Sequence, residues 1–350
     1  MSLFSHRLFS RKDNPLVRVG IVGLGRISDV HIKAFTQHTH VCIESLADVR
    51  ADIVARRANE LSVHKFSTDY KRILSDPAVD VVDILLPHYL HARVAREALK
   101  AGKYVICEKP LAIRPHDVDG ITEESKKAKK AVYLKQYFRF SALHQALKKA
   151  ILQDEIGRPY LISCVYTTDD RSLYNDPLSW RGNVREAGGG IFTDVGVHIV
   201  DFLQDLFGPA KSVSALMDKK FTKLRTKGED VSIVTLEFSR GIVANIICTA
   251  GDTSYGFRWE KHFYGSEGSL HLIDNGKAYM ELSLQKNKKS KRIGVEKDWW
   301  ERTNISALDD IIGRIVRHEA PAITLQDAKN TLEVIQGAYA SVIKGKKVIL

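Results

Sequence analysis

The sequence predicts an α/β protein in two parts: a doubly wound parallel sheet, then an α+β part with an open-faced, mainly antiparallel sheet. Between residues 16 and 136, short apolar runs alternate with amphipathic helical segments, which is typical of a parallel sheet covered by helices. The first of these runs ends in a glycine-rich turn. Beyond Pro159, strand-like segments separated by turns dominate, which favours antiparallel pairing.

The composition is that of an ordinary globular chain, with 350 residues, 44% of them hydrophobic and 27% charged. The longest apolar run, residues 79–86, contains Asp80 and Asp83, so we expect no membrane-spanning segment. The cysteines lack metal-ligand spacing, and three of them lie in apolar runs. We therefore expect reduced cysteines, no bound metal and a cytoplasmic protein. The four are Cys42, Cys107, Cys164 and Cys248.

The net charge of +11 raises the question of a nucleic-acid partner. The basic clusters at residues 126–130, 148–149 and 286–292 are far apart and do not interleave with aromatic residues, as a base-stacking surface would. We interpret them as solvated helix faces and a loop, and expect no nucleic-acid partner. An excess of positive charge still steers anionic small molecules toward a protein.

Residues 1–14 form a basic N-terminal segment, with Arg7, Arg11 and Lys12 before the first acid at Asp13. The segment is too short for a transit peptide and lacks a clear amphipathic pattern. We expect a flexible tail.

A dinucleotide-binding pattern begins at Leu16. An apolar run over residues 16–22 leads into Gly23-Leu24-Gly25-Arg26-Ile27-Ser28, a helical segment follows, and a second apolar run over 41–47 ends at Asp48. Strand, glycine turn, helix, strand and acid occur in the order that a dinucleotide-binding unit needs. Gly23 permits the tight turn, and Gly25 lets the backbone approach a pyrophosphate. Ser28 takes the place of the third glycine and is small enough for close packing.

Asp48 bears on the choice of cofactor. A carboxylate at this position accepts the ribose hydroxyls of NAD and repels the 2′-phosphate of NADP. Arg50, two residues further on, is placed to accommodate that phosphate. The sequence favours NAD and leaves NADP possible.

The alternation continues to Gln136. We expect helices over residues 51–61, 69–74, 93–101 and 118–130, and strands over 63–66, 79–86, 104–107 and 132–136, with a break at 87–91. Ligands of such sheets lie beyond the carboxyl ends of the strands. The glycine turn, Asp48, the segment from Pro87 to His91 and the segment Glu108-Lys109-Pro110 all fall at that edge.

Lys109 stands between an acid and a proline, and the proline restricts the residue before it, so the direction of this side chain is constrained. Two readings are open: a salt bridge to Glu108, or an amine directed at a substrate. A nicotinamide at the same edge favours the second.

The second part begins after Phe140. Ser141 caps a helix over residues 143–151. Thr324 and Asp327 resemble a capping box before a final amphipathic helix over 325–342. Between them we expect strands over 160–166, 212–217, 231–238, 242–249, 258–264 and 269–273.

Three glycines at 188–190 precede a segment whose apolar spacing predicts a helix from Ile191 to Leu206. Asp194 and His198 are four residues apart, so they project from one side of that helix. A carboxylate and an imidazole near a helix N-terminus, approached by glycine backbone, are able to polarise a hydroxyl group. The alternative is a surface Asp-His pair.

Together these motifs resemble the Gfo/Idh/MocA family of nicotinamide-dependent oxidoreductases, over nearly the whole chain from Leu16 onward. The resemblance rests on the glycine turn with His31, Pro87 to His91, Glu108-Lys109-Pro110, Arg139-Phe140, and the three glycines leading to Asp194 and His198. It implies a Rossmann domain over residues 15–138 and a substrate-binding and oligomerisation domain over 139–350. An exposed open sheet favours face-to-face pairing of copies, so we expect a homodimer or homotetramer.

The resemblance also implies roles for matching residues. Lys109 is similar to the lysine that contacts the reacting hydroxyl, His198 to the acid/base histidine, and Asp194 to a carboxylate that assists substrate binding. Trp180 and Arg181, in the loop before the glycines, are expected substrate contacts. The expected cofactor contacts are Gly23, Gly25, Arg26, Ile27, Asp48, Pro87, His91, Glu108 and Lys109.

The resulting hypothesis is reversible oxidation of a secondary alcohol on a sugar or sugar derivative, with hydride transfer to NAD. The unperturbed pKa of histidine is about 6.5 and that of lysine about 10.4, so His198 is the better base and Lys109 polarises the oxygen. The net charge favours an anionic substrate such as a nucleotide sugar, uronate or sugar phosphate. The alternatives are a neutral sugar or inositol, and a non-catalytic NAD-binding regulator.

Overall fold

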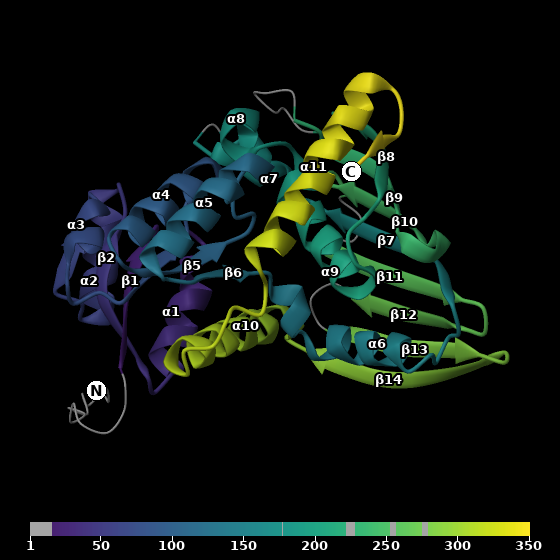
Figure 1. Ribbon diagram of the computed structural model, residues 1–350, viewed down its shortest axis with the longest axis horizontal. Helices are drawn as coiled ribbons and strands as arrows, with labels where there is room; N and C mark the ends of the chain where they lie inside the picture. The colour runs from purple at the N-terminus through teal and green to yellow at the C-terminus, as the bar shows by residue number, and fades with distance from the viewer. Residues whose placement is uncertain (1–15, 177, 222–227, 253–256, 275–278) are drawn as a thin grey trace.

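Two sheets organise the molecule (Figure 1), of which the computed structural model describes residues 16–350 except 177, 222–227, 253–256 and 275–278. The predicted tail, residues 1–14, lies outside the described residues. The parallel sheet has the strand order β3-β2-β1-β4-β5-β6, and the order reverses between β1 and β4. Its strands are β1 Val17–Val22, β2 Val41–Ala47, β3 Lys65–Ser67, β4 Val81–Ile84, β5 Tyr104–Glu108 and β6 Val132–Lys135. The predicted doubly wound sheet is confirmed.

The helices of this part are α1 Ser28–Gln37, α2 Ala51–Leu61, α3 Lys71–Ser75, α4 His88–Lys100 and α5 Pro115–Ala128. The predicted break over residues 87–91 was wrong in extent, because α4 begins at His88. Pro87 is the N-cap residue, with φ −56°. Its missing N–H is no loss at a helix start, where the first N–H groups have no partner within the helix.

The second sheet has nine strands in the order β14-β13-β12-β11-β7-β10-β9-β8-β15. Neighbours pair antiparallel except β7 with β10. The predicted open-faced, mainly antiparallel sheet is confirmed, and Figure 1 shows α6, α9 and α11 on one side of it. Its strands are β7 Pro159–Thr168, β8 Ser212–Asp218, β9 Val231–Glu237, β10 Val243–Thr249, β11 Phe257–Gly265, β12 Ser269–Asp274, β13 Tyr279–Lys286, β14 Lys289–Lys297 and β15 Val348–Ile349.

The basic segment over residues 286–292 was wrongly predicted as a loop. It forms the turn and the start of β14 in a hairpin with β13. The turn residues Asn287 and Lys288 have φ of 53° and 58°, as a two-residue hairpin turn requires. Lysines on an exposed edge strand hinder pairing with other chains. The basic residues at the start of β14 also interrupt the alternation of apolar and polar residues by which a strand is predicted.

The remaining helices are η1 Tyr137–Phe140, α6 Ala142–Leu152, α7 Arg171–Asn175, η2 Trp180–Gly182, α8 Val184–Ala187, η3 Phe192–Gly196, α9 Val197–Phe207, η4 Ser239–Gly241, α10 Trp299–Val316 and α11 Leu325–Lys344. Both predicted caps are confirmed. The Ser141 hydroxyl accepts the His144 N–H, and Thr324 with Asp327 forms a complete capping box.

Helix α10, which the sequence analysis did not predict, packs on the first sheet. Its Leu308 and Ile312 join the core that contains Val19 and Ile21 of β1. Helix α11 spans both parts, since Leu332 belongs to the core of the first sheet and Ala338 to that of the second. In Figure 1, α10 lies beside α1 and α11 crosses from the first sheet toward β8. The end of the chain therefore holds the two sheets together.

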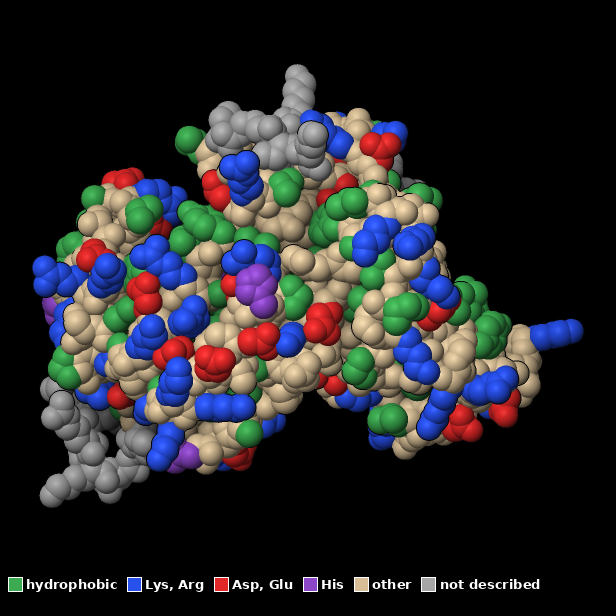
Figure 2. Space-filling view, turned by 45° about the horizontal axis from the view of Figure 1, so that its top comes forward, with side chains coloured by type: hydrophobic (Ala, Val, Ile, Leu, Met, Phe, Trp, Pro, Cys, Tyr) green, Lys and Arg blue, Asp and Glu red, His purple; other side chains and the backbone are tan. Residues whose placement is uncertain are grey.

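The described cysteines are free thiols, and three of them are buried. Within the described residues, no helix is both long and apolar enough to cross a membrane. Basic side chains on the face in Figure 2 are spread over both halves and interleaved with acidic ones.

Candidate active site

The glycine turn presents free backbone amides at the start of α1. Gly23 has φ +98°, and a Cβ there would lie 2.4 Å from the Leu85 carbonyl oxygen, whereas Gly25 has nothing within 4 Å of that position. In the described part of the chain, the N–H groups of Gly25, Arg26 and Ile27 donate to no protein acceptor. Open space beside unpaired amides at a helix N-terminus fits a pyrophosphate. These residues therefore fit the dinucleotide that the sequence implies.

Asp48, at the end of β2, has both carboxylate oxygens engaged. Oδ2 accepts the Leu24 N–H at 2.8 Å and an Arg50 Nη2–H at 3.0 Å, and Oδ1 accepts the Arg50 N–H and Nε–H at 3.0 and 2.9 Å. Burial raises the pKa of Asp48, but the hydrogen bonds from Arg50 and Leu24 outweigh it and hold the pKa below its usual value. The Arg50 side chain thus pairs with the carboxylate that the sequence analysis assigns to the ribose.

Glu108 ends β5 inside a buried ionic network. Its Oε1 lies 2.5 Å from Lys135 Nζ and 3.1 Å from His31 Nε2, and His31 Nδ1 lies 2.9 Å from Asp83 Oδ2. Burial raises the pKa of Glu108, but the charges of Lys135 and His31 outweigh it and bring the pKa well below its usual value. Glu108 Oε2 accepts the backbone N–H of Lys109 at 3.2 Å. The network fixes the backbone from which Lys109 projects.

Lys109 reaches across to the second part of the chain. Its Nζ lies 2.5 Å from the main-chain oxygen and 3.0 Å from Oδ1 of Asp194. The salt-bridge reading of Lys109 with Glu108 was wrong, because Lys135 and His31 take that carboxylate.

The carboxylate of Asp194 pairs with the cationic side chains of Lys109 and Arg181. Its Oδ2 accepts Arg181 Nε at 2.9 Å and faces the Tyr174 hydroxyl at 3.4 Å. Burial raises the pKa of Asp194, but the charges of Lys109, Arg181 and His88 outweigh it and hold the pKa well below its usual value. Arg181 stacks 4.4 Å over the Trp180 ring. Of the two predicted substrate contacts of this loop, Arg181 therefore lies at Asp194 and Trp180 lies beside Arg181.

Asp194 and His198 do not form the pair that one helical face would give. Residues Phe192–Gly196 form a π-helical turn before α9. The longer i→i+5 spacing of such a turn changes which side chains share a face. His198 Nδ1 lies 3.0 Å from Oε1 of Gln136 instead. A Cβ at Gly196 would lie 2.3 Å from the Phe192 ring, so this turn requires glycine there.

The amides of the glycine run are used inside the fold. Gly190 N–H donates to Glu229 Oε2 at 3.0 Å and Phe192 N–H to Glu229 Oε1 at 2.9 Å. A Cβ at Gly190 would lie 2.0 Å from the Glu229 carbonyl oxygen. The amides of Gly190 and Phe192 therefore bind a side chain of the fold itself. The glycines admit Glu229, whose carboxylate caps the turn.

Two matches to family models decide the family. Residues 17–136 match the family described as "Oxidoreductase family, NAD-binding Rossmann fold", and residues 144–271 match the GFO/IDH/MocA C-terminal domain. The chain belongs to the Gfo/Idh/MocA family. It is therefore an oxidoreductase with an NAD-binding Rossmann fold.

Named members of the Gfo/Idh/MocA family match much of the chain. Myo-inositol 2-dehydrogenase of Thermotoga maritima is 26% identical over 340 residues, 95% of this chain and 98% of the relative. Levoglucosan dehydrogenase of Pseudarthrobacter phenanthrenivorans is 30% identical over 210 residues, 57% and 54% of the two chains. A solved levoglucosan dehydrogenase complex with NADH and levoglucosan has the same fold, with TM-score 0.84, 21% identity and coverage of 95% and 99%.

The predicted cofactor-side residues Pro87 and His91 lie at the start of α4, beside the ends of β4 and β5. The ring nitrogens of His91 lie 2.7 Å from the carbonyl oxygens of Pro110 and Leu86. His91 thus joins the ends of β4 and β5. His88, one turn earlier, is buried with its ring 4.4 Å from that of Trp180.

Sequence reasoning missed Gln136, His88, Glu229 and Asp170. Asp170 is half-buried just after β7, and burial, then the charge of Asp194, raises its pKa. Gln136, Glu229 and Asp170 are single residues outside any motif. A signal existed only for His88, which stands between two residues already assigned to the cofactor edge.

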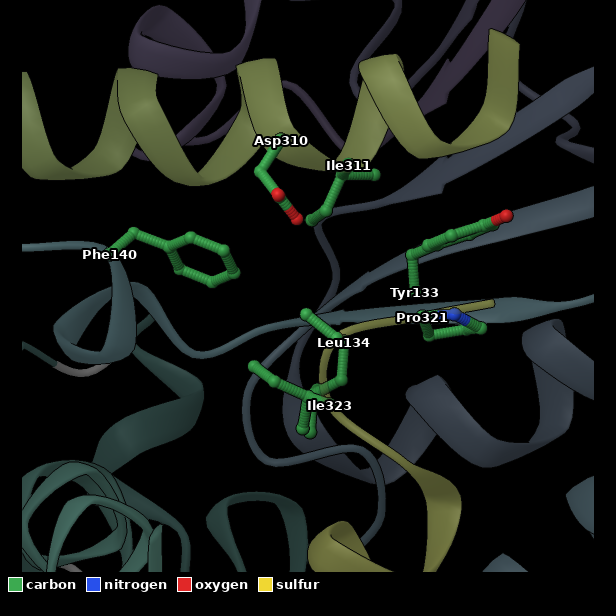
Figure 3. Close-up of a pocket in the computed structure, with 8 residues that line it drawn as sticks. Tyr133, Leu134, Phe140, Asp310, Ile311, Pro321 and Ile323 are labelled. Atoms are coloured by element: carbon green, nitrogen blue, oxygen red, sulfur yellow. The ribbon is translucent and has the colours of Figure 1, made fainter. Parts of the chain in front are cut away.

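A small cavity with no room for a water molecule lies away from this site, where α10 meets β6 (Figure 3). Cofactor pockets measure about 300–1,000 Å³, so this cavity is too small for a dinucleotide. It is lined by Tyr133, Leu134, Phe140, Asp310, Ile311, Pro321, Ala322 and Ile323.

Proposed function

We propose that this enzyme catalyses the reversible oxidation of a secondary alcohol on a sugar or cyclitol, with NAD as hydride acceptor. One observation carries the proposal: Lys109, from the cofactor edge of the first sheet, meets Asp194 of the second part at 3.0 Å. The myo-inositol and levoglucosan dehydrogenases among the relatives support a polyol substrate.

In this mechanism His198 Nε2 accepts the hydroxyl proton, while the Lys109 ammonium donates to the hydroxyl oxygen and stabilises its developing negative charge. Burial, then the charge of Lys109, holds the pKa of His198 well below 6.5, so the imidazole is neutral and free to act as a base near pH 7. Asp194 orients Lys109 and Arg181. The bound nicotinamide supplies the chemistry of hydride acceptance from the carbinol carbon, which becomes a ketone.

The charge of the site bears on the charge of the substrate. The net charge of +11 favours an anion by steering. In the site, however, the cations Lys109 and Arg181 share the carboxylate of Asp194, with Asp170 beside it. Since these charges nearly cancel, we propose an uncharged sugar or cyclitol rather than a nucleotide sugar, uronate or sugar phosphate. Myo-inositol and levoglucosan are both uncharged.

The salt dependence of kcat/KM separates the two substrate classes. For an uncharged polyol we expect kcat/KM to stay constant between 0.05 and 0.5 M salt, because no long-range attraction is screened. A steep fall with salt on an anionic sugar, at higher kcat/KM than any neutral one, would contradict this proposal.

The assay for the reaction is a screen of inositols, anhydrosugars, aldoses and anionic sugars, read as reduced-nicotinamide absorbance. On a substrate found this way, we expect Lys109→Ala and His198→Asn to lower kcat by about 10²- to 10⁴-fold, the usual contribution of general acid–base groups, with NAD binding retained. The exposed residues Lys100 and His116 provide matched controls, Lys100→Ala and His116→Asn. NAD binding without turnover on any polyol would instead support a regulator.

We also propose that a second copy of the chain covers the open face of the nine-stranded sheet. Leu216, Ile233, Ile247 and Val165 form one row across β8, β9, β10 and β7, and Leu216 and Ile233 are 73% and 40% exposed. Such a face favours pairing between copies. Light scattering at micromolar concentration tests this, and Ile233→Asp should shift the protein toward monomer.

A further inference from the structure

Three consecutive residues of the first part enclose the His198 ring. Gln136 Oε1 lies 3.0 Å from Nδ1, the Tyr137 ring meets the imidazole edge to face at 4.6 Å, and the Phe138 ring lies 5.4 Å away. His198 is only 5% exposed. In the described part of the chain, Nε2 has no hydrogen-bond partner. The ring is therefore held by one polar contact on one nitrogen.

Burial and the neighbouring charges together set the protonation state of His198. Lys109 and Lys135, from β5 and β6, disfavour the imidazolium, whereas Glu108 and Asp194 favour it. Burial, which is the largest cause, and the two lysines prevail, and the pKa lies well below 6.5. A neutral imidazole carries a single N–H. The function of His198 then depends on which nitrogen bears it.

Gln136 determines which ring nitrogen of His198 carries the proton. Its Oε1 is an acceptor, so a hydrogen bond to it requires the N–H to be on Nδ1. Gln136 directly follows β6 and is 2% exposed, and its main-chain oxygen accepts the Arg139 N–H at 3.4 Å. It is thus fixed to the sheet that positions Lys109.

We propose that Gln136 is a positioning residue that selects the Nδ1–H tautomer of His198 and so leaves the Nε2 lone pair free to take the substrate proton. The proposal rests on the proposed function, in which His198 is the base. Gln136 acts through the imidazole and touches neither substrate nor cofactor in this scheme.

The first test compares the pH profiles of kcat for Gln136→Leu and Gln136→Glu. Leucine removes the acceptor, and we expect kcat to fall by roughly 10- to 100-fold, part of what a general base contributes, with the Kd for NAD unchanged. Glutamate places a carboxylate beside Nδ1, which should raise the apparent pKa of the acid limb by about 1–3 units. Gln326→Glu, the same change at an exposed site on α11, should leave the profile unchanged.

The second test reads the tautomer without turnover. In NAD-bound protein labelled with ¹⁵N-histidine, the His198 resonances are assigned by their loss in His198→Asn. We expect a protonated Nδ1 and an unprotonated Nε2 in the wild type, and a change of this pattern in Gln136→Leu. A protonated Nε2 in the wild type, or pH profiles that ignore both substitutions, would overturn the proposal. If His198→Asn kept full turnover, the proposed function would be wrong, and the spectrum would still decide the tautomer.

Discussion

Arg50 pairs with the carboxylate of Asp48, which a ribose would use. We therefore expect the Arg50 side chain to influence the choice between NAD and NADP. Nε and Nη2 of Arg50 donate hydrogen bonds to the two carboxylate oxygens of Asp48 at 2.9 and 3.0 Å. The Arg50 side chain is nevertheless half exposed. Because a guanidinium suits a 2′-phosphate and a free carboxylate suits two ribose hydroxyls, the same residue opposes NAD and supports NADP.

Arg50→Ala should therefore raise the ratio of kcat/KM with NAD to that with NADP by about tenfold, or ~1.4 kcal/mol. Steady-state kinetics with both cofactors measures this. Arg56→Ala, an exposed arginine on α2, is the matched control. An unchanged or reduced ratio for Arg50→Ala would show that Arg50 does not compete with the ribose.

The buried network behind Lys109 gives a pH-dependent stability. Lys135→Met should destabilise the fold by about 3–5 kcal/mol at pH 7.5, since Glu108 then loses the nearest charge that pairs it. Glu108 has a depressed pKa in the native protein, so its contribution is present above its unfolded pKa and is lost as pH falls through the folded one. Without Lys135 the carboxyl takes up a proton more readily, and the deficit should shrink by pH 5. Urea unfolding at both pH values tests this.

At the scale of elements, the turn from Gly188 into α9 depends on close approach. Gly190→Ala should lower the free energy of unfolding by about 1–3 kcal/mol or more, because the new methyl group meets the Glu229 main chain. Gly25→Ala meets nothing within 4 Å, so its stability should stay within about 0.5 kcal/mol while its Kd for NAD rises. Equal stability of the two variants in urea would refute this reading of the glycines.

Elements with a clean local signal were predictable, and those that tertiary contacts decide were not. Helix α2 has the predicted bounds of 51–61, and the caps at Ser141 and Thr324 are confirmed. The lysines of β14 obscured its strand pattern. Helix α10 has Asp298 as its N-cap residue but no side-chain cap, and it buries polar residues such as Thr303 and Asn304.

In the candidate site, the sequence predicted the residues that belong to motifs. It did not predict the residues that hold those side chains in place. Lys109, Asp194 and Arg181 do converge. Gln136 contacts His198, 62 positions away, and Glu229 contacts Gly190, 39 positions away. No local sequence pattern predicts contacts over such distances. The π-helical turn escaped detection for a similar reason, since its apolar spacing is compatible with an ordinary helix.

At the scale of the whole molecule, α10 joins the core of the first sheet although it follows the second sheet in the chain. Leu308→Ala, at a fully buried position in α10, should cost about 2–5 kcal/mol. Hydrogen exchange should rise in β1, far earlier in the chain, because Leu308 packs in the same core as Val19 and Ile21. Loss of protection confined to α10 would mean that α10 unfolds without disturbing β1.

The position of α10 at residues 299–316 also sets an order of events during synthesis. The apolar side of β1 and α1 leaves the ribosome first, and the helix that covers it is made roughly 260 residues later. At about 5–20 residues per second, this surface stays uncovered for on the order of ten seconds or more. During that interval we expect the apolar side chains of β1 and α1 that later contact α10 to favour aggregation.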